Sequence, residues 1–572
     1  MTEISRSLQS RETLCGTTLD RKAGVVLARR QCLAVLAICA ALFNSGGAQE
    51  NAPRTRIADG PYRIAGMVVN AKAGGPLARA RVTIQDAKNR QSMQSLITGD
   101  DGRFEFHVPA GKYGLDGAKR GFIFASYNQH DQFSTAIVTG ADLETENLVL
   151  RLAPNAVLTG RVLDEFGEPV RNAQITVYRE DHFQGVSRIF RGGGASTDDQ
   201  GRYEVSPLGE GTIFVSAHAA PWYAVHPPAN TEGAPRLTQV DPALDVVYPT
   251  TFYGDVTEAE DATPIPVRGG DRLQADIHLT PAPSLHLTVH VPQDNEQIRF
   301  PTLQKPTFDG LEQFEQPMIQ NVAPGVFEMS GIAAGRYVMR MPDSTTGRMK
   351  EPSEINLSGG GELDVSSANR TAKIKATVQI EGATRLPAQL WIGLRGNKGR
   401  FTNTTVDGNG QAEFSDVEAG KYDIVANSAT QRYSVTRIAS EAGVTPGHEL
   451  IVPAEASLNI SLTLVGGSVT IEGFAKRAGK GVSGAMIVLV PKNPEADRDR
   501  FRRDQSDLDG SFVLANVIPG SYTLVAIQDG WDLEWAQPGV LTRYLAHGKT
   551  VTVDDRSPAN MRLAEAVEVQ AK

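Results

Sequence analysis

A short pattern occurs five times in the chain: a glycine turn, a strand of alternating side chains, and a second turn that usually contains glycine. Glycine supplies the positive φ that tight hairpin turns require, and the alternation places every second side chain in a core. The marker glycines lie 99, 124, 85 and 100 residues apart, which is the size of a domain rather than of a solenoid repeat. They are Gly102, Gly201, Gly325, Gly410 and Gly510.

The strand after the second turn begins with Gly-x-Tyr in four of the five copies. We expect these tyrosines to bury their rings and to bond their hydroxyls to nearby backbone, as in the tyrosine corner of sandwich folds. They are Tyr113, Tyr337, Tyr422 and Tyr522, whereas the second copy has Ile213.

A second unit precedes the marker in the first, second and fifth copies. It consists of a strand containing Gly66, Gly160 or Gly473, a glycine- or proline-containing turn, and another alternating strand. The third and fourth copies keep only the alternation. The first copy, Ile64-x-Gly66-x-Val68 through Asp101-Gly102-x-Phe104 to Pro109-x-Gly111-x-Tyr113, resembles the carboxypeptidase regulatory-like domain.

The second and fifth copies also match this pattern well, and the third and fourth match it weakly. Together the five copies extend the resemblance over nearly all of residues 61–568, and it implies a transthyretin-like, seven-stranded sandwich for each. In metallocarboxypeptidases, the family's domain is an accessory to a zinc peptidase domain, so the resemblance implies little about activity. We predict an all-β tandem array of about five immunoglobulin-like or transthyretin-like β-sandwich domains. They span residues 61–153, 154–283 with a Pro-rich excursion loop at 219–265, 284–370, 371–466 and 467–568, after a linker at 49–60. Separate cores joined by short linkers are expected to open one at a time.

Residues 1–48 are predicted to be a leader with a signal peptide. Arg29 and Arg30 precede an apolar run from Cys32 to Phe43 that is too short for a membrane anchor. Small residues then lead to cleavage between Ala48 and Gln49, by either the general or the twin-arginine route. The mature chain is therefore expected to be exported, to the periplasm, the cell surface or the medium, without a transmembrane anchor.

The charge and cysteine content exclude several classes of function. The net charge is −9, and because the first 48 residues hold six basic and three acidic side chains, the rest carries −12. This argues against nucleic acid as the partner. The three cysteines (Cys15, Cys32 and Cys39) all lie in the leader, so the mature chain has no cysteine for disulfides or thiolate chemistry.

Catalytic motifs are missing from the sequence. No histidine is followed three residues later by glutamate, as a zinc carboxypeptidase requires, and Gly-x-Ser-x-Gly does not occur. His278, His286 and His290 are expected to be on a solvated strand face rather than in a metal site. We therefore predict no enzyme activity, no cofactor and no metal.

Aromatic residues are the candidate ligand-binding residues, because flat rings on exposed loops stack on sugars or hold apolar peptides. They are Trp222 and Tyr223 in the excursion, and Trp531 and Trp535 near the C-terminus. The second pair has an alternative role, in which both rings share a strand face and pack on a following helix that starts near Pro538.

These features predict a non-enzymatic binding or structural protein, with a glycan or a cell-surface protein as partner. The alternative is an accessory subunit of a separate secreted peptidase or of an outer-membrane uptake system. A hydrolase within 219–283 is disfavoured, because that stretch is too short for its own core.

Overall fold

The structure is a computed structural model. It describes residues 55–572 except 142, 184, 227–240, 291–301, 314–316, 325, 341–352, 360, 364–371, 384, 397–400, 430, 442, 455, 468, 496 and 555. The predicted signal segment, with Ala48 and Gln49, lies outside these residues. The chain divides into residues 1–56 and 57–572, and the second part contains all the elements below. The division into domains with the boundaries given above stays a prediction.

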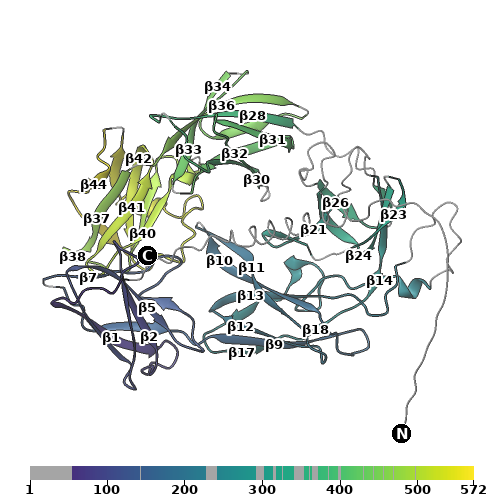
Figure 1. The fold of residues 1–572 in the computed structure, drawn as a ribbon, viewed down its shortest axis with the longest axis horizontal. Coiled ribbons are helices and arrows are strands. Elements are labelled where there is room, and N and C mark those ends of the chain that lie inside the picture. Colours follow the sequence, from purple (N-terminus) through teal and green to yellow (C-terminus); the bar gives the residue numbers. More distant parts are fainter. Residues whose placement is uncertain are drawn as a thin grey trace, which may run out of the picture. The chain divides into compact units, whose positions relative to one another are not determined.

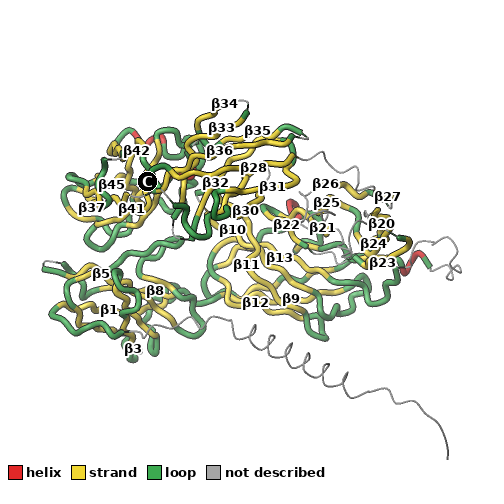
Figure 2. Tube along the Cα trace, turned by 45° about the horizontal axis from the view of Figure 1, so that its top comes forward, coloured by secondary structure: helices red, strands yellow, loops and turns green. Residues whose placement is uncertain are grey.

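The described chain is nearly all strand and loop, which confirms the predicted all-β sandwich class (Figure 2). Its described helices are short: α2 (Thr542–Leu545) and the 3₁₀ turns η1 (Pro242–Leu244), η2 (Ala259–Asp261) and η5 (Arg498–Arg500). Within the described residues, no helix has the length and apolar character needed to cross a bilayer.

Five of the seven hydrophobic clusters among the described residues follow one another along the chain and are called cores below. The strands around each of these five come from one stretch of sequence, and Figure 1 shows the strands of each stretch grouped together. The first core (57–152) is formed by two sheets, with orders β4-β1-β8 and β3-β2-β5-β6 and with β7 beside β5. Its strands are β1 (Tyr62–Asn70), β2 (Arg81–Asp86), β3 (Met93–Ile97), β4 (Arg103–Val108), β5 (Gly111–Ala118), β6 (Ala125–Ser126), β7 (Ile137–Thr139) and β8 (Leu148–Leu152).

The second core (156–279) has the same two-sheet plan, with orders β12-β9-β17 and β11-β10-β13-β15. β18 pairs with β9, β16 with β13, and β14 with β19. The strands are β9 (Ala156–Leu163), β10 (Gln174–Phe183), β11 (Val186–Ser196), β12 (Arg202–Leu208), β13 (Gly211–His218), β14 (Val246–Val247), β15 (Thr251–Phe252), β16 (Ile265–Val267), β17 (Arg272–Gln274), β18 (Ile277–His278) and β19 (Ala282–Pro283).

The stretch 219–265 is not simply an excursion loop. Residues 227–240 of it lie outside the described part, but 241–265 belong to the fold. β15 pairs with β13, and Tyr248 and Phe252 are almost completely buried. The proline content that suggested a loop therefore accompanies apolar side chains that complete the second core.

The third core (285–357) lies between sheets of order β23-β24-β20-β27 and β22-β21-β25-β26. Its strands are β20 (Leu285–His290), β21 (Thr302–Thr307), β22 (Gly310–Glu312), β23 (Met318–Ala323), β24 (Val326–Ile332), β25 (Gly335–Arg340), β26 (Ser353–Leu357) and β27 (Gly361–Leu363).

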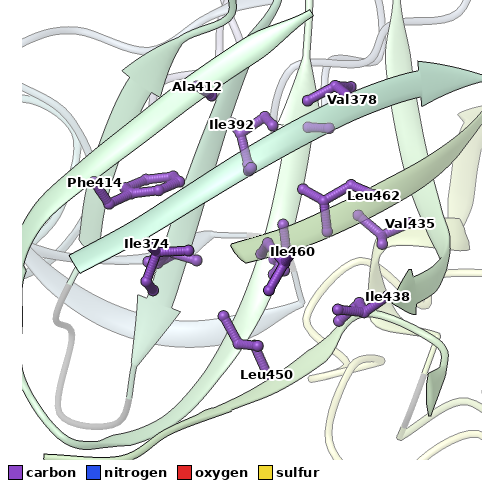
Figure 3. Packing of buried hydrophobic residues seen from close by; sticks show 14 of the residues in the cluster. Ile374, Val378, Ile392, Ala412, Phe414, Val435, Ile438, Leu450, Ile460 and Leu462 are labelled. Atoms are coloured by element: carbon purple, nitrogen blue, oxygen red, sulfur yellow. The ribbon is translucent and has the colours of Figure 1, made fainter. Parts of the chain in front are cut away.

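In the fourth core (372–464) one sheet of nine strands, which contains the path β30-β29-β32-β33-β36-β28-β31, supplies both layers. Figure 3 shows Ile374, Phe414 and Ile460 from three of these strands packing together. The strands are β28 (Ala372–Ile380), β29 (Trp391–Gly396), β30 (Phe401–Thr405), β31 (Gln411–Val417), β32 (Gly420–Asn427), β33 (Arg432–Ser440), β34 (Gly443–Pro446), β35 (Glu449–Val452) and β36 (Ser457–Gly466).

The fifth core (469–569) is also enclosed by nine connected strands, with the path β38-β37-β45-β42-β39-β40. β41 and β44 pair with β37, and β43 pairs with β42. The strands are β37 (Val469–Arg477), β38 (Lys480–Gly481), β39 (Met486–Pro491), β40 (Arg502–Gln505), β41 (Ser511–Val517), β42 (Gly520–Ile527), β43 (Lys549–Val553), β44 (Asn560–Arg562) and β45 (Val567–Gln570).

The predicted tyrosine corner is confirmed in four cores. Each hydroxyl donates to the carbonyl of the residue four positions earlier, at 2.6–3.1 Å, and each ring is buried. The marker glycines that the structure describes have positive φ, as the hairpin turns require, whereas Gly325 lies outside the described residues. The tyrosines are Tyr113, Tyr337, Tyr422 and Tyr522, and the glycines with their φ values are Gly102 (69°), Gly201 (68°), Gly410 (80°) and Gly510 (83°).

The first and fifth cores contact each other although they lie about as far apart in sequence as the array allows. Lys112 of β5 donates to Asp507 at 2.6 Å and to Ser511 at 2.8 Å. Gln505 of β40 donates to the carbonyl of Asn128 and to the hydroxyl of Thr135. Polar bonds therefore join these two cores, and whether each opens independently of the other stays a prediction.

Candidate ligand-binding site

Trp222 is the most exposed large hydrophobic side chain among the described residues, at 85% of its maximum. The neighbouring Tyr223 meets it edge to face, with ring centroids 5.8 Å apart and an angle of 87° between the planes. Tyr223 is half-buried, and its hydroxyl donates to a carboxylate oxygen of Glu165. The sequence-predicted pair therefore consists of one exposed ring beside one anchored ring.

Glu165 is the anchor of this arrangement. Its other carboxylate oxygen accepts a hydrogen bond from the buried Tyr248, at 2.7 Å. Burial opposes ionisation of Glu165, but the two tyrosine hydroxyls outweigh that effect and hold its pKa below the usual value. Burial and the carboxylate raise the pKa of Tyr223 to about 12. The ionised carboxylate therefore joins the turn after β9 to two positions, 223 and 248, of the stretch 219–265.

Phe166, which follows Glu165, is 79% exposed and is the second most exposed large hydrophobic side chain among the described residues. Asp164 fixes its turn by accepting from the backbone N–H groups of Phe166, at 2.9 Å, and of Glu168, at 2.7 Å. Sequence reasoning missed Phe166. The available signal was an aromatic residue in a turn that ends at Gly167, where polar side chains usually stand.

One hydrogen bond thus connects the residues next to the two exposed rings, since Phe166 follows Glu165 and Trp222 precedes Tyr223. We call Phe166, Trp222 and Tyr223 the aromatic platform. Rings that are exposed while their backbone is fixed can stack on a sugar face or an apolar side chain without a large loss of conformational entropy. The platform has the chemistry of a binding surface.

Trp531 and Trp535 lie elsewhere, and both are buried, at 8% and 9% exposure. Their segment is a series of turns between β42 and α2, so the predicted strand is wrong, and the helix starts at Thr542 rather than near Pro538. Trp531 donates to the carbonyl of Gly484 at 3.0 Å and stacks on His130 of the first core, with centroids 5.0 Å apart.

Arg503 lies among these rings, 4.9 Å from the centre of Trp535 and 5.7 Å from that of Trp531. Burial lowers its pKa, and its guanidinium also pairs with Asp131 at 3.1 Å. Trp535 lines a cavity of about 470 Å³ together with Phe501, Leu541 and polar side chains of the loop after β39. The C-terminal pair is mainly packed between cores, and Trp535 alone also faces a cavity of ligand size.

Of the histidines considered for a metal, His278 and His286 pair with different carboxylates. The strand pattern predicted a solvated position for His286, and this is wrong. Its ring lies between Asp245 at 2.7 Å and Glu328 at 2.6 Å. His278 pairs instead with Asp255 at 3.1 Å, and the side chain of His290 lies outside the described part. Within the described residues, no cluster of histidine and carboxylate side chains has the geometry of a metal site.

Residues 63–142 match the model of the carboxypeptidase regulatory-like domain. No curated protein matches the chain. Similar solved structures include a streptococcal ancillary pilin (13% identity, 50% of this chain and 98% of that one, TM-score 0.21). The minor pilin GBS52 of Streptococcus agalactiae is 12% identical over 39% of this chain and 97% of that one, with a TM-score of 0.22. The pilus adhesin SpaC of Lactobacillus rhamnosus GG is 12% identical over 71% and 44%, with a TM-score of 0.16. The family match covers most of the first core.

Proposed function

We propose that this protein is an exported, non-enzymatic binding protein that holds a glycan on its aromatic platform. One observation carries the proposal: the two most exposed large hydrophobic side chains of the described chain, Trp222 and Phe166, flank the Tyr223–Glu165 hydrogen bond. Exposure of apolar rings to water is unfavourable, so a partner that covers them gains free energy. Because the backbone that carries the rings is fixed, binding also costs less conformational entropy.

A glycan fits this surface better than a globular partner does. Sugar rings present flat C–H faces that stack on aromatic rings, and each stacked ring contributes about 1–3 kcal/mol by analogy with stacked bases. A cell-surface protein would need a wider apolar area than these few side chains supply. A glycan is therefore the preferred binding partner, and a cell-surface protein is the alternative.

The family match over 63–142 supports a second candidate, an accessory subunit of a separate secreted peptidase or uptake system. In metallocarboxypeptidases this domain accompanies a catalytic domain without performing the reaction. Co-purification of the exported chain with a peptidase or an outer-membrane transporter would favour this candidate.

The test compares the exported wild-type chain with Trp222→Ala and Phe166→Ala on a glycan array, followed by calorimetric titration of any glycan that binds. Each variant is expected to weaken binding about tenfold, and the fold should persist because neither side chain is in a core. Ile451→Ala, which removes another side chain that is 70% exposed, is the control and should bind normally.

Binding of no glycan by the wild type would overturn the carbohydrate proposal, as would equal binding by all four proteins. Zinc-dependent peptide hydrolysis by the pure chain would overturn its non-enzymatic part. The export part is tested by the intact mass of the secreted form, which is expected to begin at Gln49.

A further inference from the structure

An open groove of about 390 Å³ lies at one end of the sheet that contains β2, β3 and β5. Four cations line it: Arg79 in the turn before β2, Arg81 at the start of β2, and Lys119 and Arg120 directly after β5. The rest of the lining is apolar: Ala118, Phe122 and two exposed side chains, Ile97 at 62% and Phe124 at 57% exposure. No acidic residue lines the groove, so it combines positive charge with an aromatic surface.

The positive charge of this groove is not neutralised within the described part of the chain. None of the four cations forms an ion pair with another described residue, whereas many other cations of the protein do. The ammonium group of Lys119 donates to the carbonyl of Ala78 at 2.6 Å, which positions the charge without cancelling it. In a chain whose residues after 48 carry a net charge of −12, such a cluster needs an explanation.

The fold does not require these cations. The strand pairs Arg81–Ala118, Gln174–His218 and Met486–Ile527 occupy the same place in the first, second and fifth cores. By this register Arg79 corresponds to Asn172 and Gly484, and all three have positive φ, at 55°, 60° and 75°.

Asparagine and glycine adopt this left-handed conformation readily, whereas arginine does not. An arginine at this turn therefore has no conformational advantage.

The other cations are equally specific to the first core. In the second core, the positions of Arg81, Lys119 and Arg120 are held by Gln174, Ala219 and Ala220, and in the fifth core by Met486, Gln528 and Asp529. None of these residues is basic. Four positive charges thus appear together at one of the three places compared, which is the pattern of a binding site added to a common fold.

We propose that this groove binds an acidic oligosaccharide, a chain of uronic acid residues whose carboxylates pair with the cations and one of whose rings stacks on Phe124. Arginine guanidinium groups bind carboxylates through two parallel hydrogen bonds, and a solvated cation cluster attracts anions at long range. The groove has the volume of a few sugar residues. The inference does not rest on the aromatic platform, whose residues lie in another part of the chain, between positions 166 and 223.

A nucleic acid is disfavoured as the occupant. A duplex carries one negative charge for about every 1.7 Å of its length, so it would extend beyond the groove over a chain that is otherwise acidic. A short oligosaccharide with a few carboxylates meets only the four cations. Duplex DNA is therefore included in the test as a competing ligand.

The experiment is isothermal titration of the full exported chain with tetragalacturonate, with its methyl ester and with duplex DNA. We expect tetragalacturonate to bind, its affinity to fall as salt is raised, and the ester to bind at least about tenfold more weakly, because its carboxylates are uncharged. Absence of binding, equal binding of the ester, or tighter binding of DNA would overturn the proposal.

The variants Arg79→Asn and Arg81→Gln install the residues that the second core already carries, so the fold should accept both. Each is expected to weaken tetragalacturonate binding about tenfold, and Phe124→Ala should weaken it as well. Arg171→Ala, which removes an exposed arginine from the corresponding turn of the second core, and Trp222→Ala are the controls and should bind as the wild type does. Unchanged binding by both groove arginine variants, with unchanged circular dichroism, would contradict the assignment.

Discussion

Gly66 of β1 faces Phe104 of β4 across the antiparallel pair, and the ring of Phe104 occupies the space that a side chain at Gly66 would need. A Cβ on Gly66 would lie 2.9 Å from the tip of that ring and still closer to the carbonyl oxygen of Leu148 on the other side. Gly160 with Tyr203, and Gly473 with Phe512, repeat this relationship. The glycine of the first strand and the aromatic residue of the marker strand are thus one packing unit.

Gly66→Ala is therefore expected to destabilise the first core by about 3 kcal/mol, because the added methyl group meets backbone that cannot move aside. Gly114→Ala in β5 is the control, since its Cβ would have 3.9 Å of space to the nearest atom. The control should be neutral or stabilising by about 0.5 kcal/mol. The free energy of unfolding of both variants is measured by urea denaturation, with hydrogen exchange in β1 and β4 as the local readout. Equal stability of the two variants would contradict the packing unit.

Local spacing in the sequence was sufficient to predict the marker turn, the strand after it and the tyrosine corner. A glycine turn followed by alternating residues and Gly-x-Tyr fixes the backbone within about twenty residues, and Tyr522 bonds to Ile518 as expected. Contacts between distant segments leave no such signal. Arg503 meets Phe133 and Asp131 across some 370 residues, so the burial of Trp531 and Trp535 between two cores could not be derived from their own segment.

The candidate platform was predictable only in part. Trp222 and Tyr223 were visible as aromatic residues in a Pro-rich stretch, but the role of Glu165 depends on two tyrosines that reach it from 58 and 83 residues away. The exposure of Phe166 follows from the turn that Asp164 holds, which a periodicity argument does not consider.

Lys112 provides a test of the contact between the first and fifth cores. Lys112→Ala leaves the carboxylate of Asp507, whose pKa burial already raises, without its cation. We expect a loss of about 1–2 kcal/mol, because the pair is partly screened by solvent, and faster hydrogen exchange in both β5 and β41. The control is Lys421→Ala, at the same position of the fourth copy, where the exposed pair with Glu449 should contribute less than about 0.5 kcal/mol. A change confined to β5 would show that the two cores unfold independently.

Asp504 gives the fifth core a dependence on pH. Burial raises its pKa from 3.8 to about 6, so the folded state holds a proton that the unfolded state has already released between these values. Stability is therefore expected to fall as the pH rises from about 4 to about 6, by up to about 3 kcal/mol for a shift of two units.

Asp504→Asn keeps an oxygen that can accept from the N–H of Val513 and removes the charge. The variant's free energy of unfolding should depend less on pH between pH 4 and pH 6, and its urea midpoint at pH 7.5 should be higher than that of the wild type. The same slope between pH 4 and pH 6 in wild type and variant would rule out this carboxylate as its source.

His286 is expected to produce a second pH dependence, at higher pH and in a different place. Burial disfavours the charged imidazole, but hydrogen bonds from its two nitrogens to Glu328 and Asp245 outweigh burial and raise its pKa above 6.5. Asp245 also bonds to His226 at 3.0 Å, so a chain of alternating imidazole and carboxylate groups joins η1, β20 and β24.

A raised histidine pKa contributes stability that is complete below about pH 6.5 and is lost as the pH rises through the raised value. Proteolysis of the third core should therefore become faster between pH 6 and pH 9 in the wild type. His286→Gln should remove most of this change, whereas His278→Gln, in an exposed pair with Asp255, should leave it intact. If the two variants keep the same pH profile, the charge on His286 does not stabilise this junction.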